Sequence, residues 1–110
     1  MKLAIVGSRN ITKIDIASHI NVQPTLIISG GAKGVDSIAA NYAHANNIEL
    51  LVIKPDYKAH RQGAPIRRNE AIVLKCDQVL AFWDGKSRGT KYTIDFAQKH
   101  NKKVDVVMCC

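Results

Sequence analysis

The chain has 110 residues, of which 46% are hydrophobic, and it contains no repeat or low-complexity tract, so we predict one globular domain over residues 1–110. No apolar run is long enough to span a membrane and the first residues lack a signal-peptide core, so we expect a cytoplasmic protein without membrane contacts. The formal net charge of +7 suits partners that carry phosphate groups. Cys76, Cys109 and Cys110 match no zinc-binding spacing, and we expect neither a metal nor a cofactor.

Short apolar segments alternate with helical segments along the chain. The apolar runs predict five strands, at residues 2–7, 25–29, 49–54, 78–84 and 104–108. Helices are expected in the four gaps, at residues 11–20, 35–46, from Pro65 onward, and 90–101. The segment between the third strand and Pro65 is polar and is predicted to be a loop.

This alternation predicts an α/β protein with a three-layer, Rossmann-like fold, in which helices cover both faces of a five-stranded parallel sheet. Right-handed crossovers leave few strand orders, and we expect 3-2-1-4-5 rather than the flavodoxin-like order 2-1-3-4-5. In both orders, ligands bind outside the carboxyl ends of the strands. We call this end of the sheet the carboxyl edge.

Basic residues and glycines gather in the segments that follow the strands, and ten of the 16 Lys and Arg residues are predicted to lie at the carboxyl edge. Helix N-termini offer free N–H groups, and glycines allow a phosphate to approach the main chain. Two turns, SGGAKG (residues 29–34, with Ser29 and Lys33) and GKSRGT (residues 85–90), are suited to bind two phosphates. Hydroxyls of Ser8, Ser87 or Thr90 and arginine side chains would add donors. Alternatively, the glycines serve tight turns and packing, and the lysines are merely solvated.

These turns differ from the common nucleotide-binding fingerprints. The segment GSRN (residues 7–10) is not GxGxxG, and GGAKGVD (residues 30–36) lacks the Lys-Ser/Thr ending of a Walker loop. The missing lysine argues against ATP hydrolysis. A dinucleotide redox role lacks support because no acidic residue stands at the end of the second predicted strand.

Four segments, in this order, resemble the SLOG superfamily: IVGSR, ISGGAKGVDSIAANYA, APIRRNEAIV and GKSRGT. This superfamily contains the Rossmann core of the DNA-processing protein A (Smf) family and the Lonely Guy phosphoribohydrolases, and the chain is most similar to small stand-alone SLOG proteins related to YspA. The resemblance covers essentially the whole chain. The ligand-contacting positions that it implies are Gly7, Ser8, Arg9, Gly30, Gly31, Gly34, Asp36, Arg67, Arg68, Gly89 and Thr90.

The resemblance implies that the protein binds a nucleotide or a nucleotide-derived phosphorylated ligand. We expect it to act as a sensor or carrier and to form a homo-oligomer, as the related families do. We expect a bulky residue at Gly31 to abolish this binding and to leave the fold intact. The DNA-processing family's Arg-Asn pair matches Arg68 and Asn69, whereas the Lonely Guy arginine fits Arg67 better. Which of the two arginines faces the cleft is left open.

One alternative is a nucleoside 5′-monophosphate phosphoribohydrolase that releases the base, as Lonely Guy enzymes do. Their pattern G-T-x-x-E has Thr93 in place of the glutamate here, and threonine cannot stabilise positive charge developing on the ribose. The catalytic candidates are then Arg67, Glu70 and Asp36. For Asp36, a purely structural role in the first turn of its helix is an equal alternative.

A second alternative is single-stranded DNA binding of the DNA-processing protein A type. Such proteins combine a basic groove with aromatic side chains on which bases stack. Only Tyr57, Trp83 and Tyr92 are predicted near the carboxyl edge, so the charge fits and the stacking surface is small.

Overall fold

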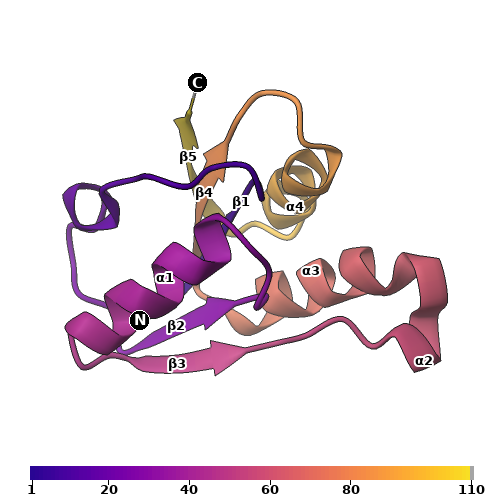
Figure 1. Cartoon of the computed structure of the whole chain (residues 1–110), viewed down its shortest axis with the longest axis horizontal. Coiled ribbons are helices and arrows are strands. Elements are labelled where there is room, and N and C mark those ends of the chain that lie inside the picture. Colours follow the sequence, from indigo (N-terminus) through magenta and orange to yellow (C-terminus); the bar gives the residue numbers. More distant parts are fainter. Residues whose placement is uncertain (110) are drawn as a thin grey trace.

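Five parallel strands form one sheet in the computed structural model of the chain, which describes residues 1–109 (Figure 1). The strands are β1 (Lys2–Gly7), β2 (Leu26–Ser29), β3 (Glu49–Val52), β4 (Gln78–Trp83) and β5 (Lys103–Met108). Their order is β3-β2-β1-β4-β5, and every neighbouring pair is parallel. The predicted Rossmann-like fold and strand order are therefore confirmed.

Four α-helices connect these strands: α1 (Val35–Ala45), α2 (Tyr57–His60), α3 (Ala64–Lys75) and α4 (Arg88–Lys99). Helix α3 begins with Pro65 in its first turn, where the missing N–H costs no hydrogen bond. Helix α4 begins at an N-cap, Ser87, whose side chain accepts a hydrogen bond from the Thr90 N–H. Within residues 1–109, none of the helices has the length and apolar character needed to cross a membrane.

Two predicted connections are wrong. In place of the helix expected over residues 11–20, the chain forms only a 3₁₀ turn at Ile16–His19. The buried residues there are Ile11 and Ile16, which would lie about 140° apart around an α-helix, so no single helical face collects them. The predicted loop before Pro65 contains α2, whose N-cap Asp56 accepts a hydrogen bond from the Ala59 N–H.

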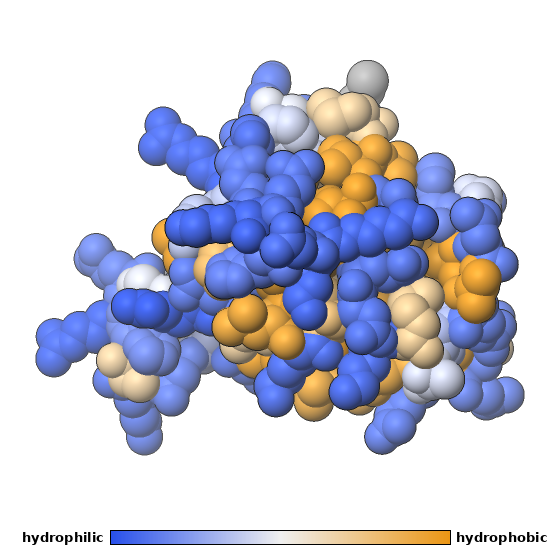
Figure 2. Space-filling model, turned by 180° about the vertical axis from the view of Figure 1, so that it is seen from behind, coloured by the Kyte–Doolittle hydropathy of each residue, from blue (hydrophilic) through white to orange (hydrophobic). Residues whose placement is uncertain are grey.

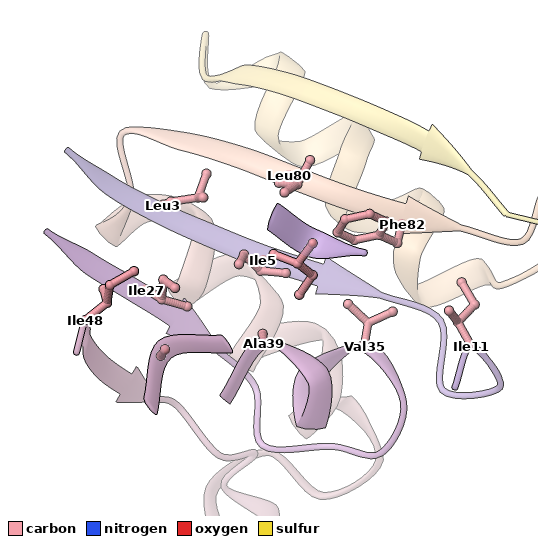
Figure 3. Close-up of a cluster of buried hydrophobic side chains, with 11 residues drawn as sticks. Leu3, Ile5, Ile11, Ile27, Val35, Ala39, Ile48, Leu80 and Phe82 are labelled. Carbon is pink, nitrogen blue, oxygen red and sulfur yellow. The ribbon is translucent and has the colours of Figure 1, made fainter. Parts of the chain in front are cut away.

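Hydrophobic side chains pack on both faces of the sheet. On β2, the successive residues Ile27 and Ile28 belong to the clusters on opposite faces, as the alternation of a strand requires. Figure 3 shows the cluster between the sheet and α1, which includes Ile5, Val35 and Phe82. Residues of α3 and α4 pack in the cluster on the other face. Cys110, one of the three cysteines that match no zinc-binding spacing, lies outside the described residues.

The connections from β1 to β2 and β3 run along the sheet in one direction, and the chain then returns across the sheet to β4, beside β1. The loops that leave β1 and β4 therefore diverge to opposite faces. In open α/β sheets this divergence leaves a crevice at the carboxyl edge.

Candidate functional site

A pocket of about 430 Å³ opens at the carboxyl edge, where the segments after β1 and β4 diverge. We call it the edge pocket. Its walls come from the end of β1, the loops after β1, β2 and β4, and residues of α1, α3 and α4. The lining residues are Val6, Gly7, Ser8, Arg9, Asn10, Gly30, Ala32, Asp36, Pro65, Arg68, Asn69, Ile72, Ser87, Gly89, Thr90 and Thr93. The volume lies within the range of about 300–1,000 Å³ that is usual for small-molecule sites.

The structure brings most of the residues singled out from the sequence to this pocket. Those that line it are Gly7, Ser8, Arg9, Gly30, Asp36, Arg68, Ser87, Gly89 and Thr90. Two others, Gly31 and Lys33, line an adjoining depression instead. Ser29, Gly34 and Arg67 line neither; Ser29 is buried, and its hydroxyl has no hydrogen-bond partner among the described residues.

Arg68 is the central charged group of the pocket wall. The residue is only 8% exposed; Nε donates to Asn69 Oδ1 at 2.7 Å and Nη1 donates to the Gly30 carbonyl oxygen at 2.6 Å. Within residues 1–109, Arg68 forms no salt bridge, so no carboxylate oxygen lies within 4.0 Å of its guanidinium nitrogens. Burial lowers the pKa of Arg68, and the charge of Asp36 partly opposes this shift while that of Arg9 adds to it. The guanidinium has thus lost hydration without gaining a contacting counter-ion, so an anion placed beside it would be stabilised.

The neighbouring Arg67 points elsewhere. Its guanidinium is mostly exposed and forms an ion pair with Glu70, with Nη1 3.6 Å from Oε1. Glu70 also accepts a hydrogen bond from the Tyr92 hydroxyl at 2.6 Å, which ties α3 to α4 outside the edge pocket. Of the two arginines, Arg68 is therefore the one in the pocket wall, and Glu70 is not among the lining residues.

The first turn of α4 forms another wall of the pocket. Ser87 Oγ lies 3.1 Å from Thr90 Oγ1 and 3.4 Å from the Thr90 nitrogen. The preceding loop is shaped by Asp84 Oδ1, which accepts hydrogen bonds from the N–H groups of Ser87 at 2.8 Å and Lys86 at 2.9 Å. These two hydrogen bonds lower the pKa of Asp84. The pocket therefore meets a fixed helix N-terminus, whose free N–H groups and dipole favour anions.

The structural reason for a glycine differs from one position of the site to another. A methyl group at Gly7 would collide with Val35, and one at Gly34 would collide with the backbone of Arg9, so packing explains both glycines. By contrast, a Cβ atom at Gly89 would meet no atom within 4 Å, and its φ is not positive. Neither packing nor backbone conformation therefore requires a glycine at position 89, which lines the pocket.

The expectation that a bulky residue at Gly31 would leave the fold intact is wrong. Gly31 has φ +71°, a backbone conformation that residues other than glycine rarely adopt. A Cβ atom there would also lie 2.8 Å from Val52 Cγ1. Substitution at Gly31 would therefore strain the loop. A loss of binding in such a variant could then come from lost stability rather than from a lost ligand contact.

Asp36 is the only acidic residue among those that line the edge pocket. Its Oδ2 accepts a hydrogen bond from the Ala32 N–H at 3.0 Å, so the carboxylate shapes the glycine-containing loop. This contact supports the structural role considered from the sequence, and the residue also lines the pocket. Within residues 1–109, no three His, Cys, Asp or Glu side chains are grouped closely enough to hold a metal ion.

Sequence reasoning named Asn69 and Thr93 only for their places in family motifs, and it did not predict that these residues or Asn10 line the site. Thr93 is 1% exposed, and its hydroxyl donates to the Gly89 carbonyl oxygen at 2.9 Å. Helical spacing was a usable signal here, because residues three apart share a face and Thr90 was already a candidate. The position that bears glutamate in Lonely Guy enzymes thus lies in the pocket wall, and in this chain it carries no charge.

The sheet order and the pocket at its reversal point define a Rossmann-like α/β protein with a ligand-sized site. Residues 1–60 match the model of the YspA, cpYpsA-related SLOG family (YAcAr). The Gene 61 protein of Mycobacterium phage D29 is 32% identical over 87 residues, which cover 74% of this chain and 70% of that protein. No solved structure gives a significant match. The chain belongs to the YspA, cpYpsA-related SLOG family, as its sequence motifs predicted, and this membership supports a nucleotide-related binding function in general.

Proposed function

We propose that the protein binds a nucleotide or nucleotide-derived phosphorylated ligand in the edge pocket, as a sensor or carrier. The observation that carries this proposal is the buried Arg68 guanidinium without a contacting carboxylate, in the same pocket as the N-terminus of α4. A phosphate placed between them would accept charge-assisted hydrogen bonds from the guanidinium and from free N–H groups. Both features line one cavity, which favours a ligand over two unrelated structural roles.

A binding screen with matched variants tests the proposal. Thermal shift identifies binders among AMP, ATP, NAD, ADP-ribose and cyclic nucleotides, since a ligand at 100 times its Kd adds about 2.7 kcal/mol of stability. Calorimetry then compares Arg68→Gln with Arg67→Gln, which remove the same charge from adjacent positions. We expect Arg68→Gln to weaken binding about tenfold or more, because a charged hydrogen bond contributes about 1.5–3 kcal/mol. Arg67→Gln should bind like the unchanged protein. Equal effects of the two variants would refute the assignment.

Hydrolysis that releases the base, as in Lonely Guy enzymes, is the second candidate. Of its catalytic candidates, Arg67 and Glu70 pair with each other away from the pocket lining, and only Asp36 lines it. Incubation with AMP, followed by chromatography for the free base, tests this activity. Release that is lost in Asp36→Asn would favour the enzyme; binding without release would favour the sensor or carrier.

Single-stranded DNA is the third candidate ligand. The protein offers less aromatic surface for stacking on its bases than the sequence suggested. The Trp83 indole N–H donates to the Ser87 carbonyl oxygen at 3.0 Å, and the Tyr92 ring stacks on Phe96. Tyr57 is 57% exposed and lines the depression beside the edge pocket, so it is the aromatic side chain best placed to stack on a base. An oligonucleotide that binds with a steep salt dependence, while mononucleotides do not bind, would favour this function.

We also propose a homo-oligomer. Figure 2 shows apolar patches among hydrophilic side chains on the face that lies at the back in Figure 1. Exposed apolar side chains include Leu74 on α3 and Val106 and Met108 on the edge strand β5. Light scattering on a size-exclusion column tests the oligomeric state. The cytoplasmic location expected from the sequence stays a prediction, which cell fractionation would test.

A further inference from the structure

A second hollow adjoins the edge pocket. It has a volume of about 840 Å³ and is more open than the edge pocket. We call it the basic depression; it is lined by Arg9, Gly30, Gly31, Ala32, Lys33, Ser37, Lys54, Pro55, Tyr57 and Arg68. Arg9, Gly30, Ala32 and Arg68 line both hollows, so the two form one continuous surface.

The basic depression concentrates positive charge. It is lined by four cationic side chains, Arg9, Lys33, Lys54 and Arg68, and by no acidic residue. Within the described part of the chain, the salt bridges involve none of these four, whereas the exposed Lys91 pairs with Asp95 at 2.7 Å. Several cations without a contacting carboxylate around one concave surface raise the local concentration of anions far more than isolated lysines do.

Gly30 forms the boundary between the two hollows. A Cβ atom there would lie 2.6 Å from Arg68 Nη1 and 2.9 Å from Asp36 Oδ2. The missing side chain therefore lets the Arg68 guanidinium lie against the main chain, where it lines both hollows. Its two hydrogen bonds use two of the five N–H groups of a guanidinium, so donors remain for a ligand.

We propose that the ligand is a nucleotide with a pyrophosphate or longer phosphate chain, which extends from the edge pocket past Arg68 into the basic depression. This inference rests on the proposed function. One phosphate lies between Arg68 and the N-terminus of α4, and the next lies among Lys33, Lys54 and Arg9. A monophosphate would leave the cations of the basic depression without an anionic partner. The exposed ring of Tyr57 offers a surface for a further sugar or base.

The test compares AMP, ADP, ATP and ADP-ribose by calorimetry at one ionic strength. The variant Lys33→Gln/Lys54→Gln removes two charges from the basic depression. Its matched control, Lys13→Gln/Lys103→Gln, removes two exposed charges that line neither hollow. We expect ADP and ADP-ribose to bind the unchanged protein about tenfold more tightly than AMP, as one added charge-assisted contact would give. The basic-depression variant should lose this gain and keep its AMP affinity; the control should keep both.

The outcomes separate this inference from the proposed function. AMP binding as tight as ADP binding, or equal losses for AMP and ADP in the basic-depression variant, would overturn the pyrophosphate assignment alone. Binding by no nucleotide would overturn both proposals. Binding of an oligonucleotide without binding of ADP or ADP-ribose would overturn the inference in favour of single-stranded DNA.

Discussion

The Arg68 guanidinium on α3 donates a hydrogen bond to the Gly30 carbonyl oxygen just beyond β2, 2.6 Å away, although 38 residues separate the two in the sequence. This contact holds a buried cation at the boundary between the edge pocket and the basic depression. Because the backbone of Gly30 and the helix α3 are both fixed, the guanidinium is positioned before any ligand arrives. Such preorganisation reduces the entropic cost of binding.

Gly30→Ala tests this relationship directly. The added methyl group would lie too close to Arg68 Nη1, and the flexible guanidinium would move away from the carbonyl oxygen. We expect the free energy of unfolding to fall by about 1–3 kcal/mol, the usual cost of losing a charged or buried hydrogen bond. Urea unfolding measures this loss, and calorimetry should show weaker ligand binding. Full retention of both stability and affinity would show that the Gly30 contact is dispensable.

Gly89→Ala separates binding from folding. The site is open within 4 Å, and alanine favours a helix over glycine by up to about 1 kcal/mol, so stability should stay the same or rise. Ligand affinity should fall, because the methyl group occupies the pocket wall. Gly63→Ala is the matched control, since its surroundings are equally open and it lies outside both hollows. A Gly89→Ala variant that binds as tightly as Gly63→Ala would contradict a ligand at the start of α4.

Tyr92→Phe tests the tie between α3 and α4. The hydrogen bond to Glu70 raises the pKa of Tyr92 above its ordinary value of 10.0, so the folded protein favours the neutral phenol. This stabilisation is complete below the unfolded pKa and is lost as the pH rises through the raised folded pKa. We expect the unchanged protein to exceed the variant in stability at about pH 8, and the difference to shrink at about pH 11.

Urea unfolding of both proteins at the two pH values measures this difference. Tyr42→Phe, on α1 and remote from Glu70, serves as the control for loss of a tyrosine hydroxyl. A gap between the unchanged protein and Tyr92→Phe that is independent of pH would argue against the Glu70 contact as its source.

Asp84→Asn tests the turn that precedes α4. The Ser87 and Lys86 N–H groups lower the pKa of Asp84 below its ordinary value of 3.8, so the folded protein favours the carboxylate. Its contribution is present above the unfolded pKa and is lost as the pH falls through the lowered folded pKa. Asparagine keeps an oxygen acceptor and lacks the charge. We expect the variant to be less stable than the unchanged protein near neutral pH, and the gap to narrow at about pH 3 in urea unfolding.

The strands and the strand order could be predicted because each strand is a short apolar run and the right-handed crossover rule excludes most topologies. The segment around Ile11 and Ile16 could not be predicted, since its isoleucines suit several conformations and only packing against the sheet selects one. Likewise, the sequence placed Arg67 and Arg68 on one helix but could not show which of the two faces the pocket. The two arginines differ in exposure only because of how α3 packs on the sheet. This packing buries Arg68 and leaves Arg67 exposed beside Glu70.

Trp83 gives the molecule a built-in optical reporter. It is the chain's only tryptophan, and its indole N–H is hydrogen-bonded to the Ser87 carbonyl oxygen at the N-cap of α4. Because the side chain of Ser87 also borders the edge pocket, a molecule docking there would alter the surroundings of the indole. Intrinsic tryptophan fluorescence of the unlabelled protein should therefore change when a ligand binds, and Trp83→Phe, which lacks this signal, serves as the control.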